Sequence, residues 1–153
     1  METTITLDRN TSKAIYKLKH QEKEVKIAIR KAFHKIGKDL KQSGEQALLF
    51  RPKSGRLYKI KINGVTYNHR ASAPGESPAN LTGALRKSLD YKVSGAREMR
   101  WEAGNTTVDY AADLEFGTDK IKPRPYMERA IKENRRNIGN HFLYEIKKST
   151  TCK

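Results

Sequence analysis

The stretch YAADLEFGTDKIKPRPYMERAI, residues 110–131, decides how the rest of this chain is arranged. Its first residue closes the alternating segment Thr-Val-Asp-Tyr, which predicts the end of a strand. Residues 111–116 predict a turn of small residues with an apolar and an acidic side, and Gly117 allows a backbone turn that a side chain would resist. The prolines at 123 and 125 fix their own φ angles and favour extended geometry before them, and Pro125 suits the first position of a helix. The predicted path is strand, bend, rigid elbow and helix.

The N-terminal residues 1–11 are polar apart from Ile5 and Leu7, and they are predicted to form a flexible arm. Two interpretations of this arm remain open. In isolation it is a loose tail, whereas in an oligomer the alternation of Ile5 and Leu7 suits the addition of a strand to a neighbour.

A long amphipathic helix is predicted for residues 12–48, where apolar residues recur three or four apart and lysines occupy most of the other face. At ~1.5 Å per residue this helix would be roughly 55 Å long, more than a domain of this size can cover. Either Gly37 or Ser43-Gly44 breaks the helix, or another subunit buries part of its apolar stripe.

A β-hairpin is predicted for residues 57–70, because two alternating segments are joined by Asn63-Gly64, the signature of a two-residue type I′ turn. In that register Tyr58 and Tyr67 lie on an apolar face, where we expect them to pack into the core. The other face is cationic and carries Lys59, Lys61 and Arg70 together with Thr66 and Asn68.

The second half of the chain predicts smaller elements and a final helix. After a loop rich in Pro, Gly and Ser comes a short helix within 81–89. Three strands of a meander follow, around 91–93, 99–101 and 108–110, with Trp101 in the core, and residues 126–148 form a second amphipathic helix. The predicted fold class is α+β: an antiparallel sheet, hairpin plus meander, packed by a long N-terminal helix and a C-terminal helix. Residues 12–148 make a single domain, and 149–153 are predicted to fray.

The composition points to a polyanionic partner. Of 153 residues, 32 are Lys or Arg and 17 are Asp or Glu, a formal net charge of +15. This surplus attracts nucleic acid, an anionic membrane surface or an acidic protein ring, and it does not choose among them. The apolar share of 36% predicts a thin core or a protein completed by its neighbours. The lone Cys152 excludes an internal disulfide and favours a cytosolic origin, and neither a signal peptide nor a membrane span is predicted.

The polar residues predict neither an enzyme nor a cofactor or metal site. The four histidines fall in different elements without the spacing of metal ligands. Asp109, Asp113 and Glu115 form an acidic cluster that suits a metal or an acid/base pair, but pairing with cations or capping of the turn is the favoured interpretation. The chain contains no phosphate-binding glycine loop and no nucleophile elbow.

Two patches of the sequence resemble a known family. The first is Tyr-Ala at 110–111, Glu-Phe-Gly-Thr at 115–118 and Pro-Arg-Pro-aromatic at 123–126; the second, at 72–89, is a Pro-rich loop followed by Thr-Gly-x-Leu-x-x-Ser-Leu. Together with the long leading helix they resemble the neck and tail-completion proteins of long-tailed bacteriophages. Tyr126 departs from the family pattern, in which Phe is expected.

The resemblance implies a structural virion protein of the head–tail junction, which joins tail to head around the DNA channel. It implies a homo-oligomeric ring of six subunits, partners among other neck and tail proteins, assembly in the bacterial cytoplasm and a place at the neck of the virion. A tail terminator capping the tail tube is one alternative, and a basic nucleic-acid-binding protein is the other. Leu114, Phe116 and Tyr126 are expected to anchor the last helix, and the arm and the loop 71–83 to contact partners. The interface candidates are Ile5, Leu7, Leu114, Glu115, Phe116, Gly117, Pro123, Arg124, Pro125 and Tyr126, and the DNA-channel candidates are Lys59, Lys61 and Arg70.

Overall fold

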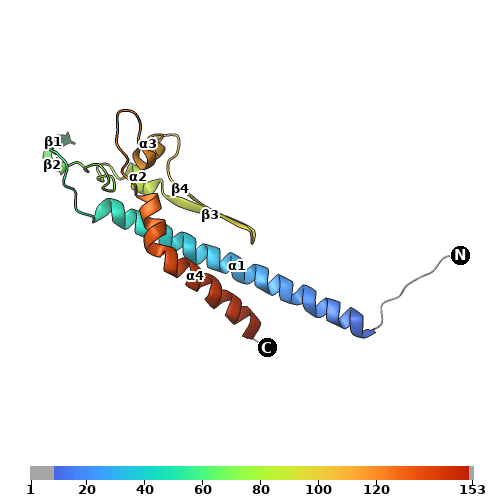
Figure 1. Ribbon diagram of the computed structural model, residues 1–153. Coiled ribbons are helices and arrows are strands. Elements are labelled where there is room, and N and C mark those ends of the chain that lie inside the picture. Colours follow the sequence, from blue (N-terminus) through green and yellow to red (C-terminus); the bar gives the residue numbers. More distant parts are fainter. Residues whose placement is uncertain (1–8, 152–153) are drawn as a thin grey trace.

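The computed structural model describes residues 9–151 and has the predicted α+β fold, with long helices at both ends of the chain (Figure 1). Ile5 and Leu7 lie outside the described residues, so the predicted arm is not tested. The elements in chain order are α1 (Arg9–Leu49), β1 (Leu57–Ile62), β2 (Val65–Arg70), α2 (Ala84–Lys87), β3 (Asp90–Ser94), β4 (Glu98–Glu102), α3 (Ala111–Phe116) and α4 (Met127–Thr151).

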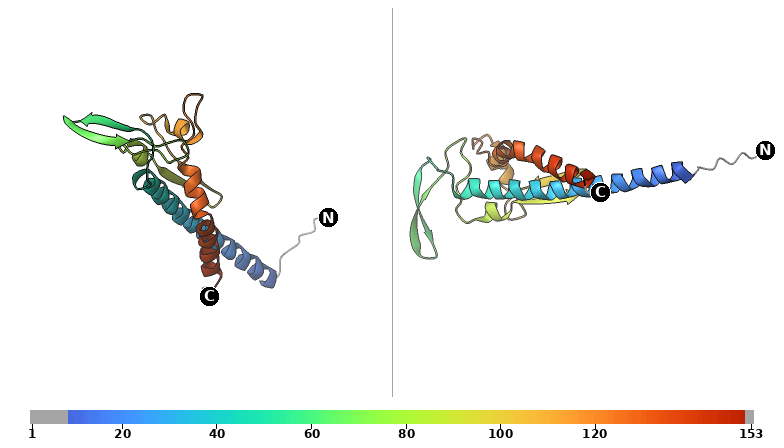
Figure 2. Two further views of the ribbon diagram at one scale, coloured as in Figure 1. Left: turned by 60° about the vertical axis from the view of Figure 1, so that its left-hand side comes forward. Right: turned by 90° about the horizontal axis from the view of Figure 1, so that it is seen from below.

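Helix α1 is the spine of the molecule and runs without a break for 41 residues. Helix α4 lies along one side of it and the β3–β4 hairpin along another, and the N-terminal part of α1 extends past both (Figures 1 and 2). The stripe that these elements bury recurs mostly at intervals of four residues, which places it on one helix face. Its buried members are Ala28, Ala32, Ile36, Leu40, Ala47 and Leu48.

The glycines of α1 are contact points rather than breaks. A Cβ atom on Gly37 would lie 2.7 Å from Cε2 of Tyr91 and closer still to two other atoms of that ring. A Cβ atom on Gly44 would lie 3.1 Å from Cζ2 of Trp101. Each glycine costs an isolated helix about 1 kcal/mol relative to alanine. Here that cost is offset because β3 and β4 can approach the helix backbone closely.

The packing of α1 against α4 combines aromatic and charged contacts. The rings of Phe33 and Phe142 meet edge to face, with centroids 5.3 Å apart. Lys35 Nζ lies 2.5 Å from Oε1 of Glu145, and His141 Nε2 lies 2.7 Å from Oδ2 of Asp39. The hydrogen bond from Lys35 lowers the pKa of the buried Glu145 carboxyl.

The densest part of the core lies at the C-terminal end of α1. Leu48 packs there with Leu85, Leu89, Val108, Ala111 and Tyr126, and the half-buried Trp101 and Leu114 pack against this cluster. The core is therefore small and joins the segments around α2, α3 and the start of α4.

The strands differ from the prediction in their arrangement. Within residues 9–151, β1–β2 and β3–β4 form separate two-stranded sheets. The third strand of the predicted meander is absent from this range: an isolated bridge between Asn105 and Val108 takes its place. Val108 is buried in the core, whereas Tyr110 is exposed, so the apolar residue at 108 reflects packing and not strand pairing.

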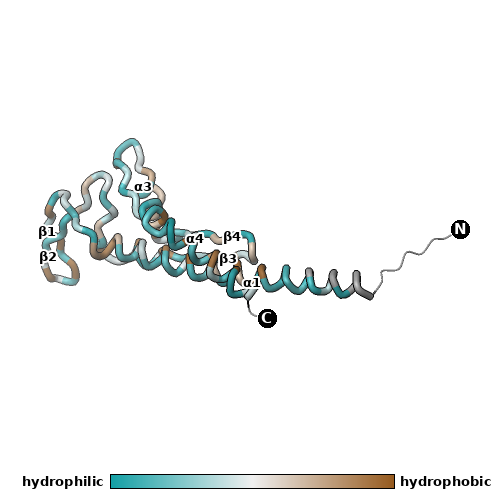
Figure 3. Tube along the Cα trace, turned by 60° about the horizontal axis from the view of Figure 1, so that its bottom comes forward, coloured by the Kyte–Doolittle hydropathy of each residue, from teal (hydrophilic) through white to brown (hydrophobic). Residues whose placement is uncertain are grey.

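The β1–β2 hairpin has the predicted register but not the predicted burial. Ile60 pairs with Tyr67 and Tyr58 with His69, and positive φ angles at Asn63 and Gly64 fit the type I′ turn. The hairpin projects away from the helices (Figure 2), and hydrophobic segments are visible along it (Figure 3). Tyr58 is 46% exposed and Tyr67 51% exposed. The prediction that both tyrosines pack into the core is wrong, because within residues 9–151 no element covers this face.

Several element boundaries also differ from the prediction. Helix α2 covers Ala84–Lys87, a short part of the range 81–89. Helix α4 begins at Met127, after Pro125, and continues to Thr151, so residues 149–151 are helical. The hydroxyl of Ser149 donates to the carbonyl of Ile146 at 2.8 Å, and the hydroxyls of Thr150 and Thr151 also donate to carbonyls of the preceding turn.

We expect Gly37→Ala to destabilise the protein by about 1–3 kcal/mol, the usual cost of overpacking, although alanine is the better helix former. Gly139→Ala in α4 is the matched control, because a Cβ atom at Gly139 meets nothing within 4 Å. The control should stabilise the protein by up to about 1 kcal/mol. Urea unfolding followed by circular dichroism at one protein concentration measures both variants. A stabilised Gly37→Ala variant would contradict the close contact with Tyr91.

Candidate functional site

The candidate site is the junction at the start of α4, which we define as α3, the elbow 117–126, the loop 71–83 and the first turn of α4. It contains most of the residues that the sequence singled out. Its segments lie together beside the C-terminal end of α1 (Figure 1).

Gly117 ends α3 and starts the elbow. Its φ of 80° and ψ of 173° fall in a region that is essentially restricted to glycine. Its N–H donates to the carbonyl of Asp113 at 2.9 Å, and Thr118 donates to Ile121 at 2.8 Å to close the next turn. A Cβ atom on Gly117 would lie 2.8 Å from both Cδ of Pro123 and the carbonyl oxygen of Ile121. The predicted role of Gly117 as a permissive backbone position is confirmed.

The Pro-Arg-Pro elbow is hydrogen-bonded on both sides. The backbone N–H of Arg124 donates to the carbonyl of Leu114 at 2.7 Å. The Arg124 guanidinium donates to the carbonyl of Ser72 through Nε and Nη2, at 3.3 and 3.4 Å. The N–H of Gly75 in turn donates to the carbonyl of Pro123 at 2.9 Å. These bonds tie the elbow to α3 and to the loop 71–83.

The carboxylate of Glu115 caps α4 from outside the helix. It accepts backbone N–H groups from Tyr126 at 2.8 Å, Met127 at 3.0 Å and Glu128 at 2.8 Å. The first N–H groups of any helix lack intrahelical acceptors, and a negative charge at this end also interacts favourably with the helix dipole. Glu115 is only 7% exposed, so water cannot replace it easily. Of the three acidic residues in the predicted cluster, Glu115 is therefore a capping group.

Tyr126 anchors the junction from the core side. Its side chain is fully buried, and its hydroxyl donates to the carbonyl of Ala111 at 3.4 Å. Burial raises the pKa of the Tyr126 hydroxyl, and the negative charge of Glu115 raises it further. The hydroxyl group that distinguishes Tyr126 from the expected Phe thus has a partner within α3.

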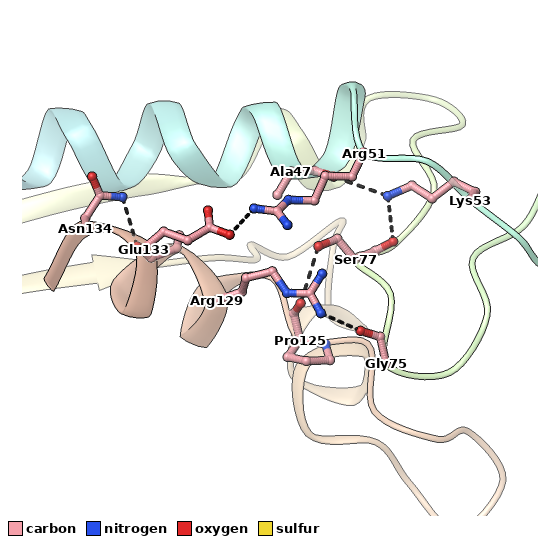
Figure 4. A network of polar contacts seen from close by, with 10 residues as sticks. Ala47, Arg51, Lys53, Gly75, Ser77, Pro125, Arg129, Glu133 and Asn134 are labelled. Carbon is pink, nitrogen blue, oxygen red and sulfur yellow. Dashed lines mark hydrogen bonds and ion pairs between the residues drawn. The ribbon is translucent and has the colours of Figure 1, made fainter.

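Basic side chains connect the junction to the end of α1 (Figure 4). Lys53 Nζ donates to the carbonyls of Ala47 at 3.2 Å and Ser77 at 2.8 Å, and burial lowers the pKa of Lys53. A cation is favourable here because the last carbonyls of α1 lack partners within the helix. Arg51 pairs with Glu133 of α4, and Arg129 Nη2 donates to the carbonyl of Gly75 at 2.8 Å.

Glu76 fixes the loop from within. Its carboxylate accepts the hydroxyl and N–H of Ser54, at 2.5 and 3.0 Å, and the N–H of Ala73 at 2.8 Å. These hydrogen bonds lower the pKa of Glu76 to about 2. The loop 71–83 is thus bound to Ser54 on one side and to the elbow 117–126 on the other.

The predicted anchors are only partly correct. Leu114 packs against the core and Tyr126 is buried in it, but Phe116 is 78% exposed. Ala111 and Glu115, four residues apart, form the buried face of α3, and Phe116 follows Glu115 on the outer side. Pro123 is exposed, whereas Arg124 and Pro125 are half-buried. Lys59, Lys61 and Arg70 are exposed on the β1–β2 hairpin, which is not one of the segments of the junction.

Sequence reasoning missed the contacts that Lys53, Ser77 and Arg129 make at the junction. Ser77 is 1% exposed, and its hydroxyl lies 3.4 Å from the carbonyl of Pro125. The missed residues act mainly on or through backbone carbonyls of distant segments. Contacts with distant backbone carbonyls leave no periodic pattern in the sequence. The only sequence feature that pointed to this part of the junction was the Pro- and Gly-rich composition of the loop.

No family model, curated protein or solved structure matches this chain. None of the helices within residues 9–151 combines the length and apolar character needed to cross a bilayer. In the same range no group of three or more His, Cys, Asp or Glu side chains is placed to hold a metal ion. The side chains of Glu76, Glu115 and Arg124 are occupied in fixing backbone, and the large apolar side chains of Phe50 and Phe116 remain exposed. This arrangement suits a rigid surface that docks against another protein.

We expect Glu115→Ala to lower the free energy of unfolding by about 2–4 kcal/mol, because three N–H groups at the start of α4, one of them fully buried, lose their acceptor. Asp113→Ala is the matched control: it removes the same charge from an exposed position of the same helix and should stay within about 0.5 kcal/mol. Urea unfolding measures both. Equal effects of the two substitutions would contradict the capping role.

We expect Gly117→Ala to combine backbone strain with a steric clash, and to destabilise the protein by more than about 2 kcal/mol. Gly95→Ala in the β3–β4 turn separates the two causes, because Gly95 has a φ of 67° but a Cβ atom there meets nothing within 4 Å. The control should cost only the strain of a left-handed residue, about 1–2 kcal/mol. Thermal unfolding measures both variants, and a Gly117→Ala variant as stable as the Gly95→Ala variant would rule out the clash.

Proposed function

We propose that this chain is a structural virion protein of the head–tail junction of a long-tailed phage, which joins tail to head around the DNA channel. It acts by assembly as a homo-oligomeric ring, for which six subunits are expected from the resemblance. One observation carries the proposal: the two patches that resemble neck and tail-completion proteins lie far apart in sequence but contact each other in the junction. Gly75 bonds to Pro123 and Ser72 accepts the Arg124 guanidinium.

Uncovered apolar surface supports a subunit completed by its neighbours. Tyr16, in the N-terminal part of α1, is 74% exposed. Further along, Val25 and Ile29 line an open groove between α1 and the β3–β4 turn. The apolar face of the β1–β2 hairpin is exposed as well. Monomeric proteins rarely leave several such surfaces open, whereas subunits of a closed ring bury them against one another.

The net charge of +15 supports a place beside a polyanion. In a ring around the DNA channel, lysine-rich faces meet either packaged DNA or acidic rings of other neck and tail proteins. The same features suit a tail terminator that caps the tail tube, and the cationic hairpin favours a nucleic-acid-binding protein as a further candidate.

Deletion of the gene from the phage that encodes this chain, followed by electron microscopy of the lysates, tests the proposal. Separate full heads and tails of normal length are expected, because the tail would lack its connection to the head. Tails of uncontrolled length would favour the tail terminator. Intact virions in normal numbers would contradict a role at the junction.

Complementation from a plasmid makes the same experiment specific. Wild type and Gly139→Ala should restore infectious particles, because Gly139 is exposed and contacts nothing that a methyl group would displace. Glu115→Ala should restore few. A fully active Glu115→Ala variant would show that the junction is not needed for assembly.

A further inference from the structure

The segment around the β1–β2 hairpin is the most one-sidedly charged part of the chain. Between Glu45 and Glu76 the sequence contains no acidic residue. Its cations are Arg51, Lys53, Arg56, Lys59, Lys61 and Arg70. The positive potential of this segment is therefore not reduced by any carboxylate of its own.

Two of these cations have structural roles, and the guanidinium of Arg56 lies over the ring of Tyr58, 5.5 Å from its centroid. Arg51 pairs with Glu133, and Lys53 binds backbone carbonyls at the junction. Within residues 9–151, Lys59, Lys61 and Arg70 form no ion pair. Arg70 donates one hydrogen bond, from Nη1 to the carbonyl of Gly55 at 3.1 Å.

The strand register gathers these three cations on one face. Lys59 pairs with Asn68, Lys61 with Thr66, and Leu57 with Arg70. Side chains two residues apart on a strand point the same way and are roughly 6.6 Å apart, so the two lysines form a short row. The neighbouring amide of Asn68 and hydroxyl of Thr66 add hydrogen-bonding groups to the same face.

We propose that this cationic face of the β1–β2 hairpin binds the phosphates of duplex DNA, without sequence preference. The inference rests on the proposed function, which places the subunit around the DNA channel. A two-stranded ribbon is narrow enough to enter the major groove, and this one projects from the body of the subunit (Figure 2). An acidic protein is the other polyanion, but a bare row of lysines with no acidic side chain to fix a register suits a uniform phosphate backbone better.

The two faces of the hairpin then have different roles. Tyr58, Ile60 and Tyr67 lie on the face opposite the lysines, since side chains alternate along each strand. In the proposed ring a neighbouring subunit covers this apolar face, so the cationic face remains free for DNA. The arrangement explains why an exposed hairpin carries both kinds of side chain.

The test measures the affinity of the full-length chain for a fluorescent DNA duplex of random sequence between 50 and 200 mM salt. The variant is Lys59→Gln/Lys61→Gln/Arg70→Gln. Each lost phosphate contact makes the negative slope of log K against log salt less steep by about 0.9. The loss of three contacts should therefore reduce the magnitude of the slope by about 2.7. Over this fourfold range of salt, wild type should lose roughly 40-fold more affinity than the variant.

The matched control is Lys38→Gln/Arg136→Gln/Lys147→Gln, which removes the same charge from exposed positions of α1 and α4. It should change the slope by less than about 1. Because Arg70 also bonds to Gly55, the double variant Lys59→Gln/Lys61→Gln is measured too, with an expected loss of about 1.8 in slope. Equal slopes for the hairpin and control variants would overturn the proposal.

Complementation separates this inference from the proposed function. If the hairpin variant binds DNA like the control but fails to restore virions, the cationic face meets an acidic protein and the inference is wrong while the junction role stands. If the hairpin carries the salt dependence but deletion of the gene leaves virions intact, the DNA contact stands and the junction role is wrong.

Discussion

The fold depends on one carboxylate placed at the start of α4. Glu115 accepts three backbone N–H groups that a helix cannot satisfy by itself, and it does so from α3 in a buried position. The elbow between α3 and α4 is fixed to α3 by the backbone N–H groups of Gly117 and Arg124, which donate to carbonyls of that helix. The first turn of α4 therefore has a fixed position and direction. That direction lays α4 along α1 and allows Phe142 to reach Phe33. A short acidic helix thereby determines how the two long helices meet.

The elements that could be predicted from the sequence are those determined by neighbouring residues. The period of apolar residues predicted α1 and α4, and Asn63-Gly64 predicted both the turn and the register of β1–β2. Gly117 was correctly predicted as a position that needs glycine. In each case a backbone angle or a side-chain period within about ten residues carries the information, so no knowledge of distant partners is needed.

The features that could not be predicted depend on partners far along the chain. Gly37 resembles a helix break until the ring of Tyr91 is placed against it. Glu115 resembles part of an acidic cluster until the N–H groups of α4 are placed around it. The exposed Phe116 and Tyr67 show a different limit. An apolar pattern predicts burial, but it does not indicate which segment would cover the apolar surface.

Hydrogen bonds and buried side chains are therefore concentrated at the junction, whereas the outlying segments have exposed apolar surfaces. Near the junction, backbone carbonyls are satisfied by Lys53, Arg124 and Arg129, and the core is concentrated around Tyr126. Away from it, the first part of α1 and the β1–β2 hairpin extend from the body with apolar side chains exposed. Exposed apolar side chains on such extended segments are unfavourable in an isolated monomer, but they offer contact surfaces to an oligomer. The net charge of +15 works against association of identical subunits. For the proposed ring, we therefore expect assembly around, or against, a partner that is negatively charged.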